Sequence, residues 1–411
     1  MTARLRILQA NLYKSSETQL SLLNDEGLQD FGLILVQEPH CCRVEDKIVT
    51  APAHHAYWTP HVPTTHNPQG RWPFRSMIWA HRNLPVKPIP TPSPDITAVL
   101  MRVEDRQILV FSVYVPQRQE GPEDPLPGHL RCIQEVTART QRDHGPQGVE
   151  IIVAGDFNRH DQLWGGDHVA QSRRQGEGQA IIELMADLGI HSLLPRGTIT
   201  YGDALRQSTI DLMMVSDGLS DDVVRCEVYA EEHGSDHRAI QTSFNLLRPE
   251  MELRPRLLLR HAPWDRIRQA VSRRLVGWQH DIVDLDEYTD DFLNVVVEAV
   301  NTFTPRTRPS RYTKRWWTAD LTQLRRNYTY WRNQARSHRR QGVRDDALEA
   351  RATEIRREYH RSLRVQKKNH WDAFLEDGQN IWQAARYLQP DSTAAFAKIP
   401  RLKTGVGEDV N

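Results

Sequence analysis

The feature of this sequence that most constrains its fold is a series of short apolar segments that each end abruptly at a polar side chain. Residues 151–158 read IIVAGDFN, so a run of apolar residues leads directly to Asp156 and Asn158. An apolar run bounded in this way is typical of a strand that is buried on both faces. Glycine, aspartate and asparagine are also common in turns, so the meaning of this segment depends on what the rest of the chain supplies.

Other apolar segments place polar residues at or near a strand end in the same way. These residues are Asn11, Glu38, Tyr114, Asp211, Asp236 and His237. Taken singly, Asn11 could form a turn and Glu38 could begin a helix. Asp211 is harder to explain, because an ionised carboxylate buried in an apolar strand is costly unless it is paired. We expect His237 to be that partner, and the whole set to converge on one spot.

Strands with a few helices dominate the first 247 residues. Strands are predicted at residues 4–9, 31–38, 75–80, 97–103, 107–114, 151–154, 209–216, 223–230 and 237–246, and helices at 15–30, 125–143 and 176–189. The proline-rich residues 84–94 are expected to form a surface connection, because proline cannot donate a hydrogen bond inside a sheet. Many strands with few helices favour an α/β fold in which two packed mixed β-sheets are flanked by helices.

The distribution of charge divides the chain into two halves. Residues 1–247 hold 22 basic and 31 acidic residues, whereas residues 248–411 hold 31 basic and 22 acidic ones. We predict a domain over residues 1–247, a linker over 248–262 and a mainly α-helical region over 263–411. The helices are expected near residues 263–278, 286–303, 317–340, 343–374 and 379–388. The basic half is the one expected to contact a polyanion.

Cysteine usage and hydropathy exclude several classes of protein. Four cysteines without a CxxC pair argue against a zinc finger or a redox motif and fit a reducing, intracellular compartment. The N-terminal residues lack the apolar core of a signal peptide. No apolar run approaches the roughly 18 residues that a membrane helix needs, so no membrane partner is expected.

In order along the chain, QAN, VQE, VYVP, GDFN, STIDLMMVS and GSDH resemble the motifs of the endonuclease/exonuclease/phosphatase superfamily. The likeness covers residues 4–246 and is closest to the endonuclease domain of non-LTR retrotransposons, where a glutamine also precedes the first asparagine. Some relatives carry an acid two residues after that asparagine, where this chain has Tyr13. The resemblance implies a DNase I-like, four-layer α/β sandwich. The aromatic and basic residues from Lys314 onward resemble the linker that precedes a reverse transcriptase in those elements.

The expected metal ligands are oxygen atoms. Glu38 and Asn11 form a hard-oxygen pair suited to Mg²⁺, with Mn²⁺ as a substitute, and Asp236 is expected to hold a second metal or to tune the site. The metal would act as a Lewis acid on the phosphoryl oxygen and the leaving group. Asp156 is expected to position or deprotonate the attacking water. In the family, the matching positions play these roles.

The remaining site residues are expected to handle the charge that develops on the phosphate. Asn158 and His237 would donate to the non-bridging oxygens, and Tyr114 would hydrogen-bond to the phosphate. Asp211 would orient the imidazole of His237 and raise its pKa, which favours the cation. Hydrolysis of a phosphodiester requires these three kinds of help: an activated water, relief of charge and assistance to the leaving oxygen.

Contacts to DNA are expected from two loops and from the basic helices. The loop residues are Arg173, Arg174, Arg196, Tyr201 and Arg206, and a solvated turn is the alternative for each loop. The helices of residues 317–374 carry many arginines with interspersed tryptophan and tyrosine, which suits a phosphate backbone and stacked bases. The alternative is a helical hairpin whose aromatic residues pack together and whose arginines are solvated.

Residues 288–291 read YTDD and match the YxDD signature of reverse transcriptases. That signature requires a β-hairpin, whereas the apolar residues around these positions recur at helical spacing. We therefore interpret the match as coincidence and expect no polymerase within this chain.

The sequence therefore predicts a Mg²⁺-dependent endonuclease that nicks DNA by phosphodiester hydrolysis and leaves a 3′-hydroxyl and a 5′-phosphate. In a complete element that 3′-hydroxyl would prime reverse transcription at the target. DNA is the expected substrate, element RNA is an expected partner of the basic helices, and the nucleus is the expected location. Two alternatives stay open: a phosphatase or phospholipase of the same superfamily, and a non-catalytic remnant that binds nucleic acid.

Overall fold

The computed structural model groups the chain into two compact units, one formed by Met1–Glu250 with Tyr312–Asn411 and the other by Met251–Arg311. The residues it describes are 3–44, 47–50, 55–67, 71–117, 124–144, 148–170, 174–202, 207–248, 257–276, 285–306, 316–341 and 343–376. The helix predicted at residues 379–388 lies outside the described residues. The later part of the basic half thus groups with the strands of the first half, and the predicted boundaries at residues 247 and 262 stay a prediction.

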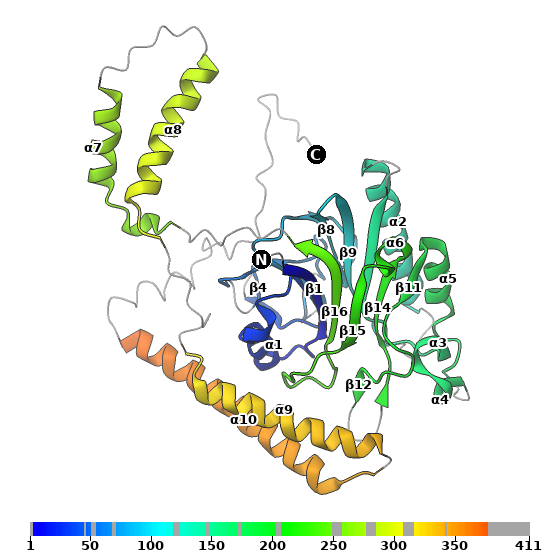
Figure 1. Cartoon of the computed structure of the whole chain (residues 1–411). Helices are drawn as coiled ribbons and strands as arrows, with labels where there is room; N and C mark the ends of the chain where they lie inside the picture. Colours follow the sequence, from blue (N-terminus) through cyan, green and yellow to red (C-terminus); the bar gives the residue numbers. More distant parts are fainter. Residues whose placement is uncertain are drawn as a thin grey trace. The chain divides into compact units, whose positions relative to one another are not determined.

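Two six-stranded sheets form the centre of the first unit (Figure 1). The first sheet consists, in order, of β15 (Val223–Val228), β16 (Ile240–Arg248), β1 (Ala3–Asn11), β2 (Leu33–Gln37), β6 (Ser76–His81) and β5 (Trp58–His61). The second consists of β11 (Ile190–Ser192), β14 (Asp211–Ser216), β10 (Val149–Asp156), β9 (Arg106–Tyr114), β8 (Ile96–Val103) and β7 (Val86–Ile89). Each sheet is mixed, because β1 is parallel to β2 and β10 is parallel to β9, whereas the other neighbours are antiparallel.

Short helices and hairpins complete this part of the first unit. The helices are α1 (Ser16–Leu23), α2 (Leu126–His144), α3 (Gln162–Gly165), α4 (Asp167–Ala170), α5 (Gln179–Leu188) and α6 (Asp217–Ser220). The hairpins pair β3 (Cys41–Val44) with β4 (Lys47–Thr50) and β12 (Tyr201–Gly202) with β13 (Gln207–Ser208). None of the described helices is both long enough and apolar enough to cross a membrane.

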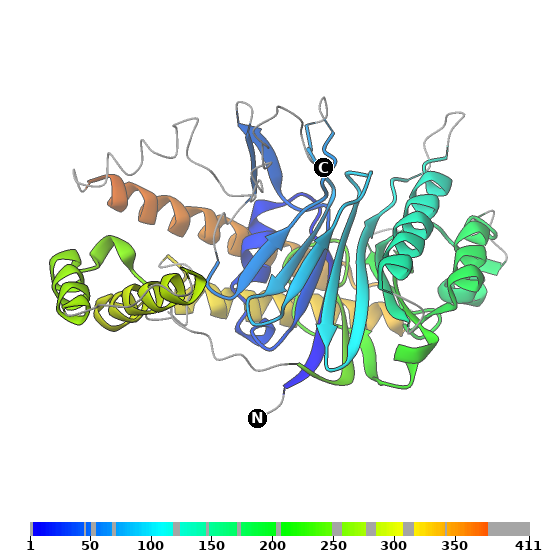
Figure 2. The same ribbon diagram turned by 90° about the horizontal axis from the view of Figure 1, so that it is seen from above.

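Alternate side chains along each central strand belong to different layers of the core. In β1, Leu5 and Ile7 pack between the two sheets, whereas Leu8 and Ala10 pack against the outer face that α1 covers. The second sheet is divided in the same way, and its outer face packs on α2 and α5 (Figure 2). Burial on both faces explains why these strands read as continuous apolar runs. The expected α/β arrangement of two packed mixed sheets flanked by helices is confirmed.

Two local expectations are corrected. The helix predicted over residues 15–30 ends at Leu23, because Asn24 caps it through the Leu20 carbonyl and a separate 3₁₀ turn follows at Glu26–Leu28. Residues 84–94 are not only a connection, since they contain β7, in which Pro88 pairs with Val99 of β8. β7 is the edge strand of its sheet, and an edge tolerates a residue that cannot donate a hydrogen bond.

The second unit is a small helical pair. It contains α7 (Trp264–Leu275) and α8 (Leu285–Phe303), preceded by a 3₁₀ turn at Leu259–His261, and its core includes Ile267 and Ala299. The YTDD residues 288–291 lie within α8. Their helical conformation confirms that the match to the reverse-transcriptase signature is a coincidence, because that signature requires a β-hairpin.

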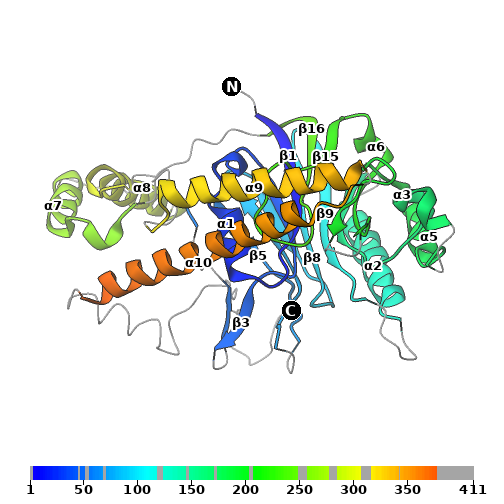
Figure 3. The ribbon, with the colours of Figure 1, turned by 90° about the horizontal axis from the view of Figure 1, so that it is seen from below.

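Two long helices of the first unit, α9 (Ala319–Arg340) and α10 (Asp346–Glu376), lie side by side as a hairpin (Figure 3). The hairpin packs against Leu20 of α1 through a buried cluster. The members that it and the residues before it contribute are Trp316, Trp317, Leu321, Tyr328, Ile355, Tyr359 and Leu363. Four of the aromatic residues predicted to stack on bases are therefore part of a core.

A buried carboxylate, Asp25, anchors the hairpin at the end of α1. Its Oδ1 lies 3.2 Å from the Arg325 guanidinium of α9, and its Oδ2 lies 3.4 Å from Nε2 of His233 and accepts a hydrogen bond of 3.1 Å from the Tyr229 hydroxyl. Burial alone would raise the pKa of Asp25, but the hydrogen bond and charge of His233, together with Arg325, hold that pKa well below its ordinary value. Asp25 is thus an ionised group within the interface.

We predict that Asp25→Asn lowers the free energy of unfolding at pH 7 by about 3 kcal/mol, because it removes the carboxylate that faces the buried Arg325 guanidinium. A carboxylate whose folded-state pKa is depressed contributes stability above its unfolded pKa of about 3.9, and this contribution is lost as the pH falls through the folded-state pKa. Urea unfolding at pH 7, 4 and 3 should therefore show the wild type and the variant converging in acid. The exposed Asp30→Asn is the matched control, and a difference that stays constant with pH would contradict the assignment.

Candidate active site

The polar groups expected at strand ends meet at one end of the two sheets. In the first sheet, Asn11 ends β1 in register with Gln37 of β2. In the second, Asp156 ends β10 in register with Tyr114 of β9 on one side and Asp211 of β14 on the other. A hydrogen bond of 3.0 Å from Nδ2 of Asn11 to Oδ2 of Asp156 joins the sheets at this point. The segment GDFN therefore ends a central strand inside a polar cluster.

Asp156 is buried among hydrogen-bond donors and another acid. Its Oδ1 accepts the backbone N–H of Asn158, and its Oδ2 accepts the amide groups of Asn11 and Asn158, each at 3.0 Å. Burial, reinforced by the Asp211 carboxylate, raises the pKa of Asp156 to about 8. A carboxylate with a pKa near neutrality can both accept and release a proton at physiological pH.

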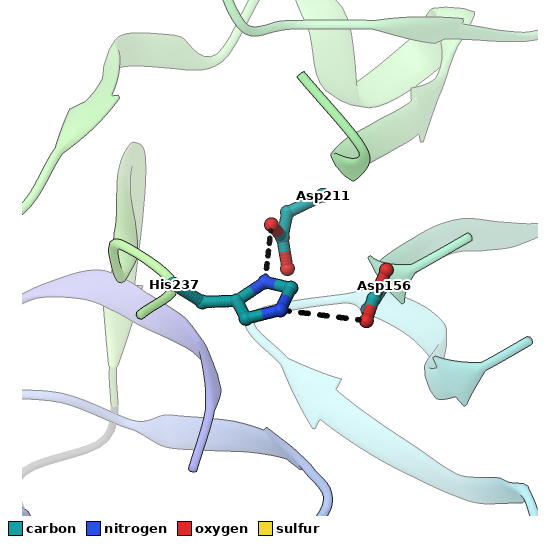
Figure 4. A group of neighbouring side chains, drawn as sticks. All are labelled: Asp156, Asp211 and His237. Atoms are coloured by element: carbon teal, nitrogen blue, oxygen red, sulfur yellow. Dashed lines mark hydrogen bonds and ion pairs between the residues drawn. The ribbon is translucent and has the colours of Figure 1, made fainter. Parts of the chain in front are cut away.

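His237 lies between the two aspartates of the second sheet (Figure 4). Its Nδ1 is 2.8 Å from Oδ2 of the fully buried Asp211, and its Nε2 is 3.8 Å from Oδ2 of Asp156. Burial alone would lower the pKa of His237, but the two carboxylates raise it to about 10. The ring is therefore a cation at neutral pH, with Nδ1 donating to Asp211 and Nε2 turned toward Asp156.

A buried chain of side-chain amides supports Asp211 from the first sheet. Nε2 of Gln9 donates to Oδ1 of Asp211 at 2.9 Å and to Oε1 of Gln37 at 2.7 Å. Nε2 of Gln37 donates in turn to the Ser112 hydroxyl of β9 at 2.8 Å. The sequence reasoning gave these residues no role. Their signals in the sequence are a polar residue within an otherwise apolar strand and their places in the QAN and VQE motifs.

Glu38 follows β2 with a positive φ of 48°, a conformation that is rare outside glycine and that is often found at functional sites. Its carboxylate accepts a hydrogen bond from the Tyr114 hydroxyl and forms an ion pair with the Lys14 ammonium group. Burial raises the pKa of Tyr114, so the phenol stays protonated and donates. The Arg75 guanidinium, held by Asp95 through two bonds of 2.6 Å, lies 5.1 Å from the Tyr114 ring.

Asn158 also has a positive φ, of 49°, and its amide holds the strand end in place. Its Nδ2 donates to the Val115 carbonyl and to Asp156, each at 3.0 Å. The next residue, Arg159, is almost fully buried and donates to the carbonyls of Asn158 and Pro116. In this arrangement both amide hydrogens of Asn158 are engaged in orienting the residues around Asp156.

Asp236 lies half-buried beside His237, and its carboxylate raises the pKa of that histidine. The Tyr201 ring lies 5.0 Å from the His237 ring, and the two residues form an isolated antiparallel bridge. The Gly202 N–H donates to the Asp236 carbonyl at 3.1 Å. Tyr201 thus lies directly beside the histidine.

The arginines proposed to bind DNA have different surroundings. Arg174 is exposed and lies 3.3 Å from Nε2 of His160. Arg196 is half-exposed and forms an ion pair of 2.5 Å with Asp167. Arg173 and Arg206 lie outside the described residues. Both described arginines lie in the unit that contains the sheets.

The site offers two sets of candidate metal ligands. Ligand atoms of Asp156, Asp211 and His237 lie within 4.8 Å of one another, a grouping that could hold a metal ion. Two of these atoms are already hydrogen-bonded to each other in the Asp211–His237 pair. Glu38 offers a second possibility, because its buried Oε1 already faces a cation, the Lys14 ammonium group, with which it forms an ion pair. The donor set therefore fits a divalent cation that prefers oxygen.

Residues 108–241 match the family model described as "Endonuclease-reverse transcriptase" of the endonuclease/exonuclease/phosphatase group. The matched residues include Tyr114, Asp156, Asn158, Asp211 and His237. No curated protein matches the sequence.

Several solved structures are similar to this chain. The endonuclease domain of TRAS1, a telomere-specific non-LTR retrotransposon, is 22% identical over 60% of this chain and 100% of its own, with a TM-score of 0.45. An AP endonuclease from Leishmania major is 14% identical over 60% of this chain and 89% of its own, with a TM-score of 0.46. The APE2 catalytic domain from Xenopus laevis is 14% identical over 60% of this chain and 94% of its own, with a TM-score of 0.44.

Gly155 is required by the close approach of β10 to β9 at the site. A Cβ atom at this position would overlap the backbone of Val113, whereas a Cβ at Gly128 of α2 would meet open space. We predict that Gly155→Ala lowers the free energy of unfolding by about 1–3 kcal/mol, the usual cost of overpacking. Gly128→Ala should be neutral or stabilising by up to about 1 kcal/mol, as is usual for glycine within a helix. Equal thermal stability of the two variants would refute this account of the strand end.

Proposed function

We propose that this protein is a metal-dependent endonuclease that nicks DNA by hydrolysis and leaves a 3′-hydroxyl and a 5′-phosphate. The observation that carries the proposal is the buried array in which Asn11 meets Asp156 across the two sheets while Asp211 holds His237 beside the same carboxylate. It places a carboxylate with a pKa near neutrality next to a fixed cation. Hydrolysis of a phosphodiester requires both a proton acceptor and a stabiliser of negative charge.

In this proposal Asp156 accepts the proton of the attacking water. Its pKa, raised to about 8, suits a general base at neutral pH. His237 donates through Nε2 to a non-bridging phosphate oxygen, because Asp211 already occupies Nδ1. Asn158 primarily orients Asp156, and it can donate to the phosphate only by giving up one of its present acceptors.

Glu38 is the proposed principal metal ligand, with Asn11 and Asp236 as further oxygen ligands. Mg²⁺, or Mn²⁺ in its place, supplies Lewis-acid stabilisation of the phosphate and the leaving oxygen when bound. Tyr114 holds the Glu38 carboxylate through its hydroxyl, which leaves the other carboxylate oxygen for the cation. Lys14, which forms an ion pair with Glu38, marks the place where positive charge is favoured.

DNA is favoured over an inositol phosphate or a lipid as substrate by the retrotransposon-like motifs QAN and STID and by the basic helices. A nick that leaves a 3′-hydroxyl can be extended by a polymerase, as target-primed reverse transcription requires. Chromosomal DNA as substrate implies a nuclear location in a eukaryotic cell.

We predict that Asp156→Asn and His237→Gln each lower the rate of plasmid nicking by about 10²–10⁴-fold, because each removes a proton-transfer or charge-stabilising group. Relaxation of supercoiled plasmid in Mg²⁺ measures the rate, and EDTA should abolish the reaction. Primer extension from the nicks should proceed without phosphatase treatment, as expected for 3′-hydroxyl ends.

Asp143→Asn, on the exposed face of α2, is the control and should nick at the wild-type rate. Circular dichroism checks that each variant is folded. Equal nicking by the wild type and both site variants would remove the site assignment. Release of phosphate from an inositol phosphate, with the plasmid left intact, would instead identify a phosphatase of the same superfamily.

A second nucleic-acid contact is proposed for a groove that α10 shares with α1. A groove of about 250 Å³ is lined there by Arg364, Lys367, Lys368 and Trp371, together with residues of α1. Trp371 is 45% exposed, and the three cations beside it are exposed as well. A single strand, such as element RNA, could place its phosphates on the cations and a base on the indole.

We predict that replacing Arg364, Lys367 and Lys368 together by glutamine weakens binding of a single-stranded oligonucleotide. The slope of log K against log salt should fall by about 2, which is about 0.7 for each of three lost phosphate contacts. Fluorescence anisotropy at several salt concentrations measures the slope. The matched control replaces Arg131, Arg139 and Arg142 of α2. An equal loss of affinity in both triple variants would show that only the net charge of the protein matters, and would contradict a contact in this groove.

A further inference from the structure

The loop between β15 and β16, residues 229–239, carries His237 into the site. At its two ends the loop is closed by a bond of 2.8 Å from the Tyr229 N–H to the Ala239 carbonyl. Between these ends, the backbone of Glu232, Asp236 and Arg238 forms hydrogen bonds with other parts of the first unit. The position of His237 therefore depends on the segments that hold this loop.

Helix α9 holds the first half of the loop through Glu232. The Glu232 carboxylate forms an ion pair with the Arg336 guanidinium, and both side chains are less than 9% exposed. The Glu232 N–H donates to the Thr329 hydroxyl at 3.2 Å, and Thr329 lies two turns before Arg336 on the same face of α9. Both the side chain and the backbone of this loop residue are thus bound by α9.

The next loop residues are held by α1 and α10 together. Nδ1 of His233 lies 2.9 Å from the Ser21 hydroxyl, which also accepts a bond of 2.6 Å from the Tyr359 hydroxyl of α10. Gly234 has a φ of 99°, and a Cβ there would overlap the His360 ring of α10. The loop therefore packs against α10 so closely that only glycine fits.

Ser235 connects this anchored point to the imidazole of His237. The Ser235 hydroxyl donates to the Asn11 carbonyl at 2.7 Å and accepts the His237 N–H at 3.1 Å. His237 then reaches Asp211 at 2.8 Å. Along residues 232–237, nearly every residue is in contact with another segment of the first unit. A displacement of Glu232 is therefore transmitted along the loop to the imidazole of His237.

We infer that the α9–α10 hairpin is a positioning element for His237, and that Arg336 acts through Glu232 to seat this histidine against Asp211. The inference rests on the proposed function, because its kinetic test measures the rate of DNA nicking. It assigns a catalytic requirement to a segment that lies outside the matched residues 108–241. Arg336 and Thr329 are positioning residues, since they act on the site through their contacts with Glu232.

The test uses the full-length chain with Arg336→Met, Arg336→Lys and Thr329→Val. The exposed Arg326→Met on the same helix is the matched control. Single-turnover and steady-state nicking assays separate kcat from KM, and hydrogen–deuterium exchange follows the amides of residues 231–237. Glu232→Gln alone, and Glu232→Gln combined with Arg336→Met, test whether the two residues act as one unit.

We expect Arg336→Met to lower kcat by about 10- to 100-fold with KM within about twofold, because the histidine is misplaced while the DNA contacts remain. Exchange over residues 231–237 should be about tenfold faster. Arg336→Lys should restore part of kcat, Arg326→Met should match the wild type, and the double variant should be no worse than the worse single variant. Thr329→Val should show the same changes in kcat and exchange, but smaller ones. It serves as the test variant if Arg336→Met does not fold.

Unchanged kcat and unchanged exchange in folded variants would overturn the inference. A rise in KM with kcat preserved would also overturn it, because it would show that Arg336 contacts DNA. If the wild type does not nick any DNA substrate, the proposed function fails, and the exchange data alone then decide whether the hairpin holds the loop.

Discussion

The hydrogen bond between Asn11 and Asp156 is the contact on which the arrangement of the site depends. It joins the last residues of two central strands that belong to different sheets, so it fixes how the sheet ends face each other. A second hydrogen bond between the sheets runs from Gln9 of β1 to Asp211 of β14, the strand beside β10. Polar side chains buried between apolar layers are costly unless every hydrogen-bond partner is present. This cost makes the observed alignment of the two sheets more favourable than alignments shifted by a residue.

The parts of the fold that repeat locally could be predicted from the sequence. Strands buried on both faces leave continuous apolar runs, which is why the runs before Asp156 and Glu38 were sufficient to predict strand ends. Parallel neighbours then bring those ends together at one edge of each sheet. Pro88 shows the limit of such reasoning, because its effect depends on whether the strand lies at the edge of a sheet, which no local pattern reveals.

The contacts between distant segments could not be predicted in the same way. Gln9 and Gln37 read as isolated polar residues, and only the packing of one sheet on the other gives them Asp211 and Ser112 as partners. The aromatic residues of α9 and α10 read equally well as a stacking surface or as a core. The packing of the helices assigns each aromatic residue to one of these roles. Tyr328 is fully buried in the core, whereas Trp371 is exposed.

The bond from Tyr359 to Ser21 joins residues that are 338 positions apart in the chain. During synthesis from the N-terminus, α1 and the loop before β16 emerge long before the helices that cover them. Contacts between such distant segments form late, because closing a long loop costs entropy before any contact is gained. Newly made chains consequently pass through a stage in which the sheets can be complete while Leu20 still faces water, and this stage is the one most exposed to aggregation and to chaperone binding.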